Sequence, residues 1–96
     1  MTLNNILSKI KQHKLKISKD FSVDKIGIFG SYANGTADDK SDIDIYVEFK
    51  EKTVDNLLGL MVYLDELFDK KVDVLHKHKN NNKVFMNTIK DDIIYG

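Results

Sequence analysis

The sequence predicts an α/β (α+β) domain in which a small mixed β-sheet is flanked by helices. Apolar residues recur at helical spacing near the N-terminus and again in the segment that ends at Phe68, and short runs rich in Val, Ile, Tyr and Phe lie between and after these segments. The resulting order of elements is helix, strand, turn, strand, helix, strand and helix, which is typical of such domains. A chain of 96 residues is long enough for one domain, and we expect residues 1–96 to form a single domain.

The first half of the chain is predicted to hold a helix, a strand and a tight turn. A helix over residues 2–17 is indicated by apolar residues three or four positions apart, namely Leu3, Ile6, Leu7 and Ile10. Residues 23–29 are predicted as a strand, with Ile26 and Ile28 on one face. Residues 30–35 then form a turn or a short helical turn, because Gly30 and Gly35 enclose it.

The second half continues the alternation. Residues 42–49 are predicted as the second strand, and Asp55 is predicted to cap a helix that runs to Phe68. The segment KKVDVLH, residues 70–76, is predicted as a third strand. A polar loop, a last helix over residues 84–90 and an extended segment at DDIIYG complete the chain. The 55–68 helix has more apolar residues than one face needs, so part of it is expected to lie in a protein interface, and a homo-oligomer is one alternative.

Composition and charge exclude several classes of protein. Fifteen basic residues, all of them Lys, balance 15 acidic residues, which argues against a surface for long nucleic acid. Without Arg, contacts to phosphate must use Lys, hydroxyl groups, backbone N–H groups or a metal ion. The absence of Cys excludes disulfides and thiolate zinc sites. No apolar run is long enough to span a membrane, and Lys residues interrupt the N-terminal segment, so we expect no membrane contact, no signal peptide and a cytoplasmic location.

Two acids interrupt the second predicted strand. Because side chains alternate along a strand, Ile43, Ile45 and Val47 share the core face, whereas Asp42 and Asp44 share the opposite face with Tyr46 and Glu48. Adjacent carboxylates repel one another, and a divalent cation removes this repulsion. The pair is therefore a candidate site for Mg²⁺. The alternative is that these acids form the solvated face of a half-exposed sheet, and Tyr46 either lines a ligand site or is a surface residue.

Two further features favour the metal site. Gly30 and Ser31 end a strand at a turn, where the backbone can approach a ligand closely and the hydroxyl can bind phosphate. Thr36 stands where a P-loop needs Lys, so a Walker A site is rejected. Asp73 is another acid inside an apolar strand, and a third carboxylate beside Asp42 and Asp44 would complete a two-metal site or act as a base.

Together these motifs resemble the nucleotidyltransferase superfamily related to DNA polymerase β, and the length resembles its minimal nucleotidyltransferases, the MNT proteins. The resemblance rests on G-S-x-A-x-G, S-D-x-D and a later lone Asp, which are here Gly30, Ser31, Ala33, Gly35, Ser41, Asp42, Asp44 and Asp73. It implies that Gly30 and Ser31 hold the triphosphate of a nucleotide. It also implies that Asp42 and Asp44 bind two Mg²⁺ ions and that Asp73 completes the catalytic and metal site.

The sequence departs from this pattern in one respect. Relatives often carry Arg within G-S-x-A-x-G, whereas this chain has Tyr32 and Asn34 at the variable positions. Lys40 and Lys25 are the alternative point charges that could bind phosphate in place of Arg.

The resemblance implies a Mg²⁺-dependent transfer of AMP from ATP to an acceptor hydroxyl, with Asp73 as the base. By the same resemblance the acceptor is a Tyr of a helical HEPN toxin, and the chain is the antitoxin of a type VII toxin–antitoxin pair. Two alternatives remain open. One is a catalytically weak or inactive antitoxin that acts by direct contact with its partner, and the other is a structural Ca²⁺ or Mg²⁺ site without catalysis.

Overall fold

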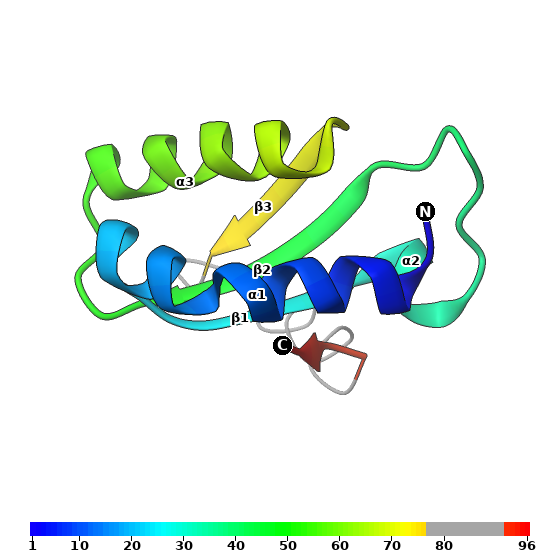
Figure 1. Cartoon of the computed structure of the whole chain (residues 1–96), viewed down its shortest axis with the longest axis horizontal. Helices are drawn as coiled ribbons and strands as arrows, with labels where there is room; N and C mark the ends of the chain where they lie inside the picture. Colours follow the sequence, from blue (N-terminus) through cyan, green and yellow to red (C-terminus); the bar gives the residue numbers. More distant parts are fainter. Residues whose placement is uncertain (77–91) are drawn as a thin grey trace.

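A computed structural model of the chain describes residues 1–76 and 92–96 (Figure 1). The elements follow the predicted alternation of helices and strands. They are α1 (Leu3–Phe21), β1 (Val23–Phe29), α2 (Gly30–Asn34), β2 (Ile43–Phe49), α3 (Val54–Phe68), β3 (Val72–His76) and β4 (Ile94–Tyr95). The polar loop and the helix predicted over residues 84–90 lie outside the described residues. The predicted α/β fold class is confirmed.

The sheet is mixed, as predicted, and its strand order is β3-β2-β1-β4. Strand β1 pairs antiparallel with β2 and with β4, whereas β2 pairs parallel with β3. A parallel pair needs a crossover connection, and α3 supplies it between β2 and β3 (Figure 1). The short β4 confirms the extended segment that was predicted at the end of the chain.

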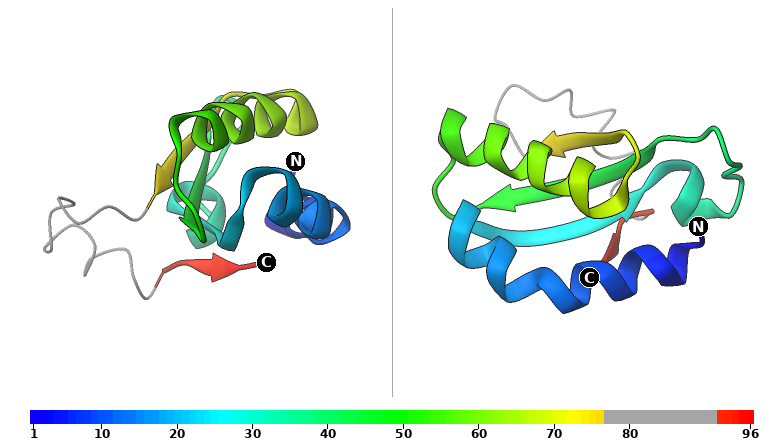
Figure 2. Two further views of the ribbon diagram at one scale, coloured as in Figure 1. Left: turned by 90° about the vertical axis from the view of Figure 1, so that its left-hand side faces the viewer. Right: turned by 45° about the horizontal axis from the view of Figure 1, so that its top comes forward.

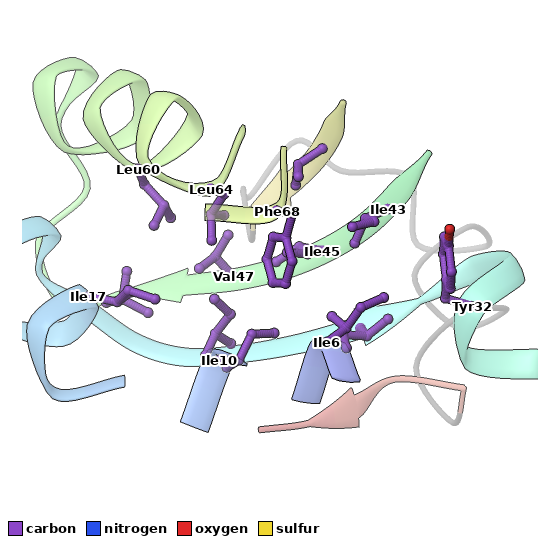
Figure 3. Close-up of a cluster of buried hydrophobic side chains, with 14 residues drawn as sticks. Ile6, Ile10, Ile17, Tyr32, Ile43, Ile45, Val47, Leu60, Leu64 and Phe68 are labelled. Carbon is purple, nitrogen blue, oxygen red and sulfur yellow. The ribbon is translucent and has the colours of Figure 1, made fainter. Parts of the chain in front are cut away.

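Helices α1 and α3 cover one face of the sheet (Figure 2). The core between the helices and the sheet is apolar, and Figure 3 shows part of it. Its fully buried side chains are Ile6, Ile10 and Ile17 of α1, Ile26, Ile28, Ile43, Ile45 and Val47 of the sheet, and Leu60 and Leu64 of α3. Every buried residue of β2 except Tyr46 belongs to this cluster. The predicted core face of the second strand is therefore confirmed, and the acids lie on the other face.

Polar contacts hold the two helices together at the edge of this core. The Tyr63 hydroxyl lies 2.7 Å from Nδ1 of His13, and the Lys9 ammonium donates to the Leu67 carbonyl at 3.2 Å. The ring of Phe21 packs against Tyr63, with centroids 5.5 Å apart. This contact helps to explain why α1 extends one turn beyond the predicted end at residue 17.

The predicted cap of α3 was wrong. Thr53, and not Asp55, caps this helix: its backbone is extended, and its hydroxyl oxygen accepts a hydrogen bond from the Asn56 N–H at 3.0 Å. Asp55 lies in the first turn of the helix. Thr and Asp both cap helices, so the residue types alone did not choose between them. In the described residues, no helix has the length and apolar character needed to cross a membrane.

Candidate active site

Three predicted site residues come together on the sheet face opposite the helices. In the parallel register of β2 and β3, Asp44 lies directly opposite Asp73. The Ile43 N–H donates to the Lys71 carbonyl at 3.2 Å, which places Asp42 beside Lys71 at the start of the same pair of strands. Asp42 and Asp44 are partly buried, and Asp73 is exposed.

The Gly-Ser turn lies against these acids. Phe29, the last residue of β1, pairs with Asp44, so α2 begins directly beside the Asp44 side chain. Gly30 has a φ of +73°, and a Cβ at this position would overlap the Asp44 carboxylate. Only glycine fits both the backbone conformation and the available space. The chain thus brings Gly30, Ser31 and Asp44 to one end of the β1–β2 pair.

The two variable positions of the Gly-Ser motif have structural roles. Tyr32 is buried in the core cluster. The side-chain oxygen of Asn34 accepts hydrogen bonds from the N–H of Thr36 at 3.1 Å and from its hydroxyl at 2.6 Å, which fixes the turn after α2. Neither side chain carries a positive charge that could replace the Arg of relatives.

The charge at the acids is poorly compensated. Burial, followed by the negative charges of Asp73 and Asp42, raises the pKa of Asp44 above its usual value. A set of three carboxylates on one sheet face is the donor type that Mg²⁺ prefers, and a divalent cation would offset this repulsion. Asp42, Asp44 and Asp73 are therefore the type of ligands that a magnesium site needs.

Lys71 is a member of this site that the sequence analysis missed. Its ammonium lies 3.8 Å from Oδ2 of Asp42 and 3.9 Å from Oδ1 of Asp73. As the side chains stand, no group of three or more acidic or imidazole side chains in residues 1–76 and 92–96 is close enough to hold a metal ion. The position of Lys71 two residues before Asp73, on the same face of the strand, was the available signal.

The two lysines considered as phosphate ligands differ in position. Lys25 pairs with Glu48, four residues along β1 from the pair of Phe29 and Asp44, a distance of about 13 Å at ~3.3 Å per residue. Lys40 is exposed in the loop before β2, where its N–H donates to the side chain of Asp38 at 2.8 Å.

Tyr46 is neither a surface residue nor part of the acid cluster. It is buried, and its ring meets that of Tyr95 edge to face, with centroids 6.4 Å apart. Burial, followed by the charge of Glu48, raises the pKa of its hydroxyl. The Tyr95 ring of β4 therefore reaches Tyr46 across β1, the strand between them. A hollow of about 500 Å³ lies between the first three residues of the chain and α2, and none of the three acids lines it.

Known proteins resemble this chain in sequence. The family model described as "Polymerase beta, Nucleotidyltransferase" matches residues 5–96. A protein of Thermococcus cleftensis, the protein adenylyltransferase MntA, is 33% identical over 96 residues, and the match covers 99% of this chain and 96% of that protein. A Methanocaldococcus jannaschii protein, MJ0128, provisionally named a protein adenylyltransferase, is 40% identical over 96 residues, covering 98% of this chain and 97% of the relative.

Solved structures share the fold. A protein provisionally described as a minimal nucleotidyltransferase aligns with a TM-score of 0.82 at 23% identity, over 98% of this chain and 95% of that chain. One chain of the complex between the tri-AMPylated HEPN toxin of Shewanella oneidensis and the MNT antitoxin aligns with a TM-score of 0.60 at 20% identity. The alignment covers 88% of this chain and 66% of that chain. A toxin–antitoxin structure with AMP-PNP aligns with a TM-score of 0.62 at 25% identity, over 85% of this chain and 77% of that chain. The resemblance seen in the sequence is confirmed: the chain belongs to the polymerase β nucleotidyltransferase family and is a nucleotidyltransferase.

Proposed function

We propose that the chain is a single-domain protein adenylyltransferase that moves AMP from ATP to a hydroxyl group of a partner protein, with two Mg²⁺ ions as cofactors. The observation that carries this proposal is the register that sets Asp44 opposite Asp73, with Gly30 packed against Asp44. Full-length relatives named protein adenylyltransferases support the choice of reaction. The toxin–antitoxin structure with AMP-PNP supports ATP as the donor.

Each site residue has a role in this proposal. Asp42, Asp44 and Asp73 would hold the metal ions, while the Gly30 backbone and the Ser31 hydroxyl contact the triphosphate. Asp73 also accepts the proton of the acceptor hydroxyl. The acceptor oxygen forms a bond to the α-phosphorus of ATP, the bond from that phosphorus to the bridging oxygen breaks, and pyrophosphate leaves with the electron pair. Mg²⁺, when bound, supplies positive charge to the phosphate oxygens.

The acceptor in this proposal is a Tyr hydroxyl of a HEPN toxin, which the transfer silences, and the two proteins form a type VII toxin–antitoxin pair in the cytoplasm. The support is the fold shared with the complex of an MNT antitoxin and a tri-AMPylated HEPN toxin. The exposure of Asp73, near the start of β3, agrees with a protein acceptor.

A second candidate is an antitoxin that acts by contact with little or no catalysis. Two observations favour it. The Asn34 side chain, at one of the two variable positions of the Gly-Ser motif, stabilises a turn and carries no positive charge, and Lys71 lies near two of the three acids.

One experiment separates these candidates. The chain is co-expressed with the protein encoded beside it, and the purified pair is incubated with Mg²⁺ and each of the four NTPs labelled at the α-phosphate. The proposal expects mass increments of AMP on a partner Tyr, lost in Asp44→Asn and retained in Asp55→Asn, a matched acid on the first turn of α3. Full inhibition of the partner by Asp44→Asn, with no mass change, would support the contact antitoxin instead.

A further inference from the structure

Lys71 completes a square of four side chains on the acid face. Asp42 comes directly before β2 and Asp44 is the second residue of that strand, while Lys71 comes directly before β3 and Asp73 is its second residue. Asp44 is opposite Asp73, and Asp42 lies beside Lys71. Three corners are therefore carboxylates and the fourth is an ammonium group. The Lys71 side chain is long enough to approach both Asp42, just before β2, and Asp73, two residues further along the chain.

The position of its ammonium is that of a counter-cation shared by two acids. The distances of 3.8 Å to Asp42 and 3.9 Å to Asp73 are nearly equal, so the charge lies between the two carboxylates and is not committed to either. The ammonium side chain is 71% exposed, against 41% for Asp42 and 52% for Asp73. Exposed pairs of this length contribute little to stability, so the stability of the fold does not explain the arrangement.

We propose that Lys71 is an internal competitor of the divalent cation: its ammonium holds Asp42 and Asp73 in the metal-free protein and must move away before these carboxylates can bind a metal ion. This inference rests on the proposed metal site and adds a positioning residue to it. Lys71 thereby weakens the binding of a metal ion alone. When a nucleotide brings the metal with its own phosphate ligands, the displaced ammonium faces an anionic substrate, so its charge then favours the loaded site.

Titration with Mn²⁺ in the absence of nucleotide tests the inference, with free Mn²⁺ followed by its electron paramagnetic resonance signal. Replacing Lys71 by Met removes one positive charge near a dication, and the affinity for Mn²⁺ should rise by about five- to tenfold at moderate ionic strength. Lys71→Arg keeps the charge and should retain the affinity of the original protein. Lys11→Met, at an exposed position of α1, has the same change of net charge and should also leave the affinity unchanged.

A second readout uses the loaded site. With Mn²⁺ and a non-hydrolysable ATP analogue together, the higher Mn²⁺ affinity of Lys71→Met should shrink or reverse. The variant lacks the ammonium group that offsets the negative charge of the triphosphate. An unchanged or weaker Mn²⁺ affinity of Lys71→Met without nucleotide would overturn the inference, as would a lack of Mn²⁺ binding in every variant. Neither result depends on AMP transfer, so this inference and the proposed reaction fail in different experiments.

Discussion

Two glycines at the ends of α2 both have a positive φ but have different surroundings. Gly30 has a φ of +73° and faces the Asp44 carboxylate, whereas Gly35 has a φ of +81° and a Cβ there would meet nothing within 4 Å. Substitution of each glycine therefore separates the cost of the backbone conformation from the cost of displacing Asp44.

We expect Gly35→Ala to lower the free energy of unfolding by about 1 kcal/mol, the usual cost of a left-handed backbone at a residue with a Cβ. Gly30→Ala should lower it by roughly 2 kcal/mol or more, because displacement of Asp44 adds to the same strain. It should also abolish metal binding, which Gly35→Ala should retain. Urea unfolding and Mn²⁺ titration of both variants check this, and equal losses in the two would contradict it.

The raised pKa of Asp44 gives a second prediction at this scale. Burial and the charges of Asp73 and Asp42 make the folded state bind this proton more tightly than the unfolded chain does. The contribution of Asp44 to stability is therefore greatest at low pH and falls as pH rises through its raised pKa.

At neutral pH the ionised carboxylate destabilises the metal-free protein, so Asp44→Asn should raise its free energy of unfolding. The gain should be roughly 0.5 kcal/mol or less, because the carboxylate is only partly buried and solvent screens it. Thermal unfolding from pH 4 to pH 8 checks the sign: the variant should gain most over the original protein at the higher pH. A variant that is less stable throughout would show that Asp44 has a structural contact beyond these charges.

At the scale of elements, the start of α3 distinguishes a cap from a residue of the first turn. Thr53→Ala should lower the free energy of unfolding by about 1 kcal/mol, because it removes the acceptor of the Asn56 N–H. Asp55→Ala should cost only about 0.3–0.5 kcal/mol, the value of an exposed acid near a helix N-terminus. Chemical denaturation of the two variants measures both values. A larger loss for Asp55→Ala would restore the cap that the sequence predicted.

The sequence predicted the strands and the acid face because alternation along a strand depends on neighbouring residues alone. Ile43 and Ile45 had to share a face, and Asp42 and Asp44 the other. The burial of Tyr46 could not be predicted in this way, since its ring contact comes from Tyr95, far along the chain. The contacts of Lys71 were also beyond reach, because the strand period gives its face but not the direction of a long side chain.

At the scale of the whole molecule, the residues of the acid site come from three different elements. Gly30 belongs to α2, Asp44 to β2 and Asp73 to β3. A ligand held by all three should therefore stabilise the entire fold and not only its own surroundings.

Mg²⁺ with a non-hydrolysable ATP analogue, at about 100 times the dissociation constant, should stabilise the folded protein by about 2.7 kcal/mol. For a domain of this size that corresponds to a rise of roughly 10–20 °C in the thermal midpoint. Asp73→Asn should reduce the shift and Asp42→Asn with Asp44→Asn should abolish it, as measured by scanning calorimetry. The same shift in the double variant would place the ligand somewhere other than the acid face.

The parallel pairing of β2 with β3 has a consequence for the order in which activity appears during synthesis. The ribosome makes the chain from its N-terminus, so Gly30, Ser31, Asp42 and Asp44 emerge well before Asp73, and the antiparallel β1–β2 hairpin can form from local contacts first. Asp73 takes its place only after α3 has folded back across the sheet, which is the slower, long-range step. A nascent or truncated chain thus lacks Asp73, and under the proposed function we expect transfer to begin only once β3 has joined the sheet.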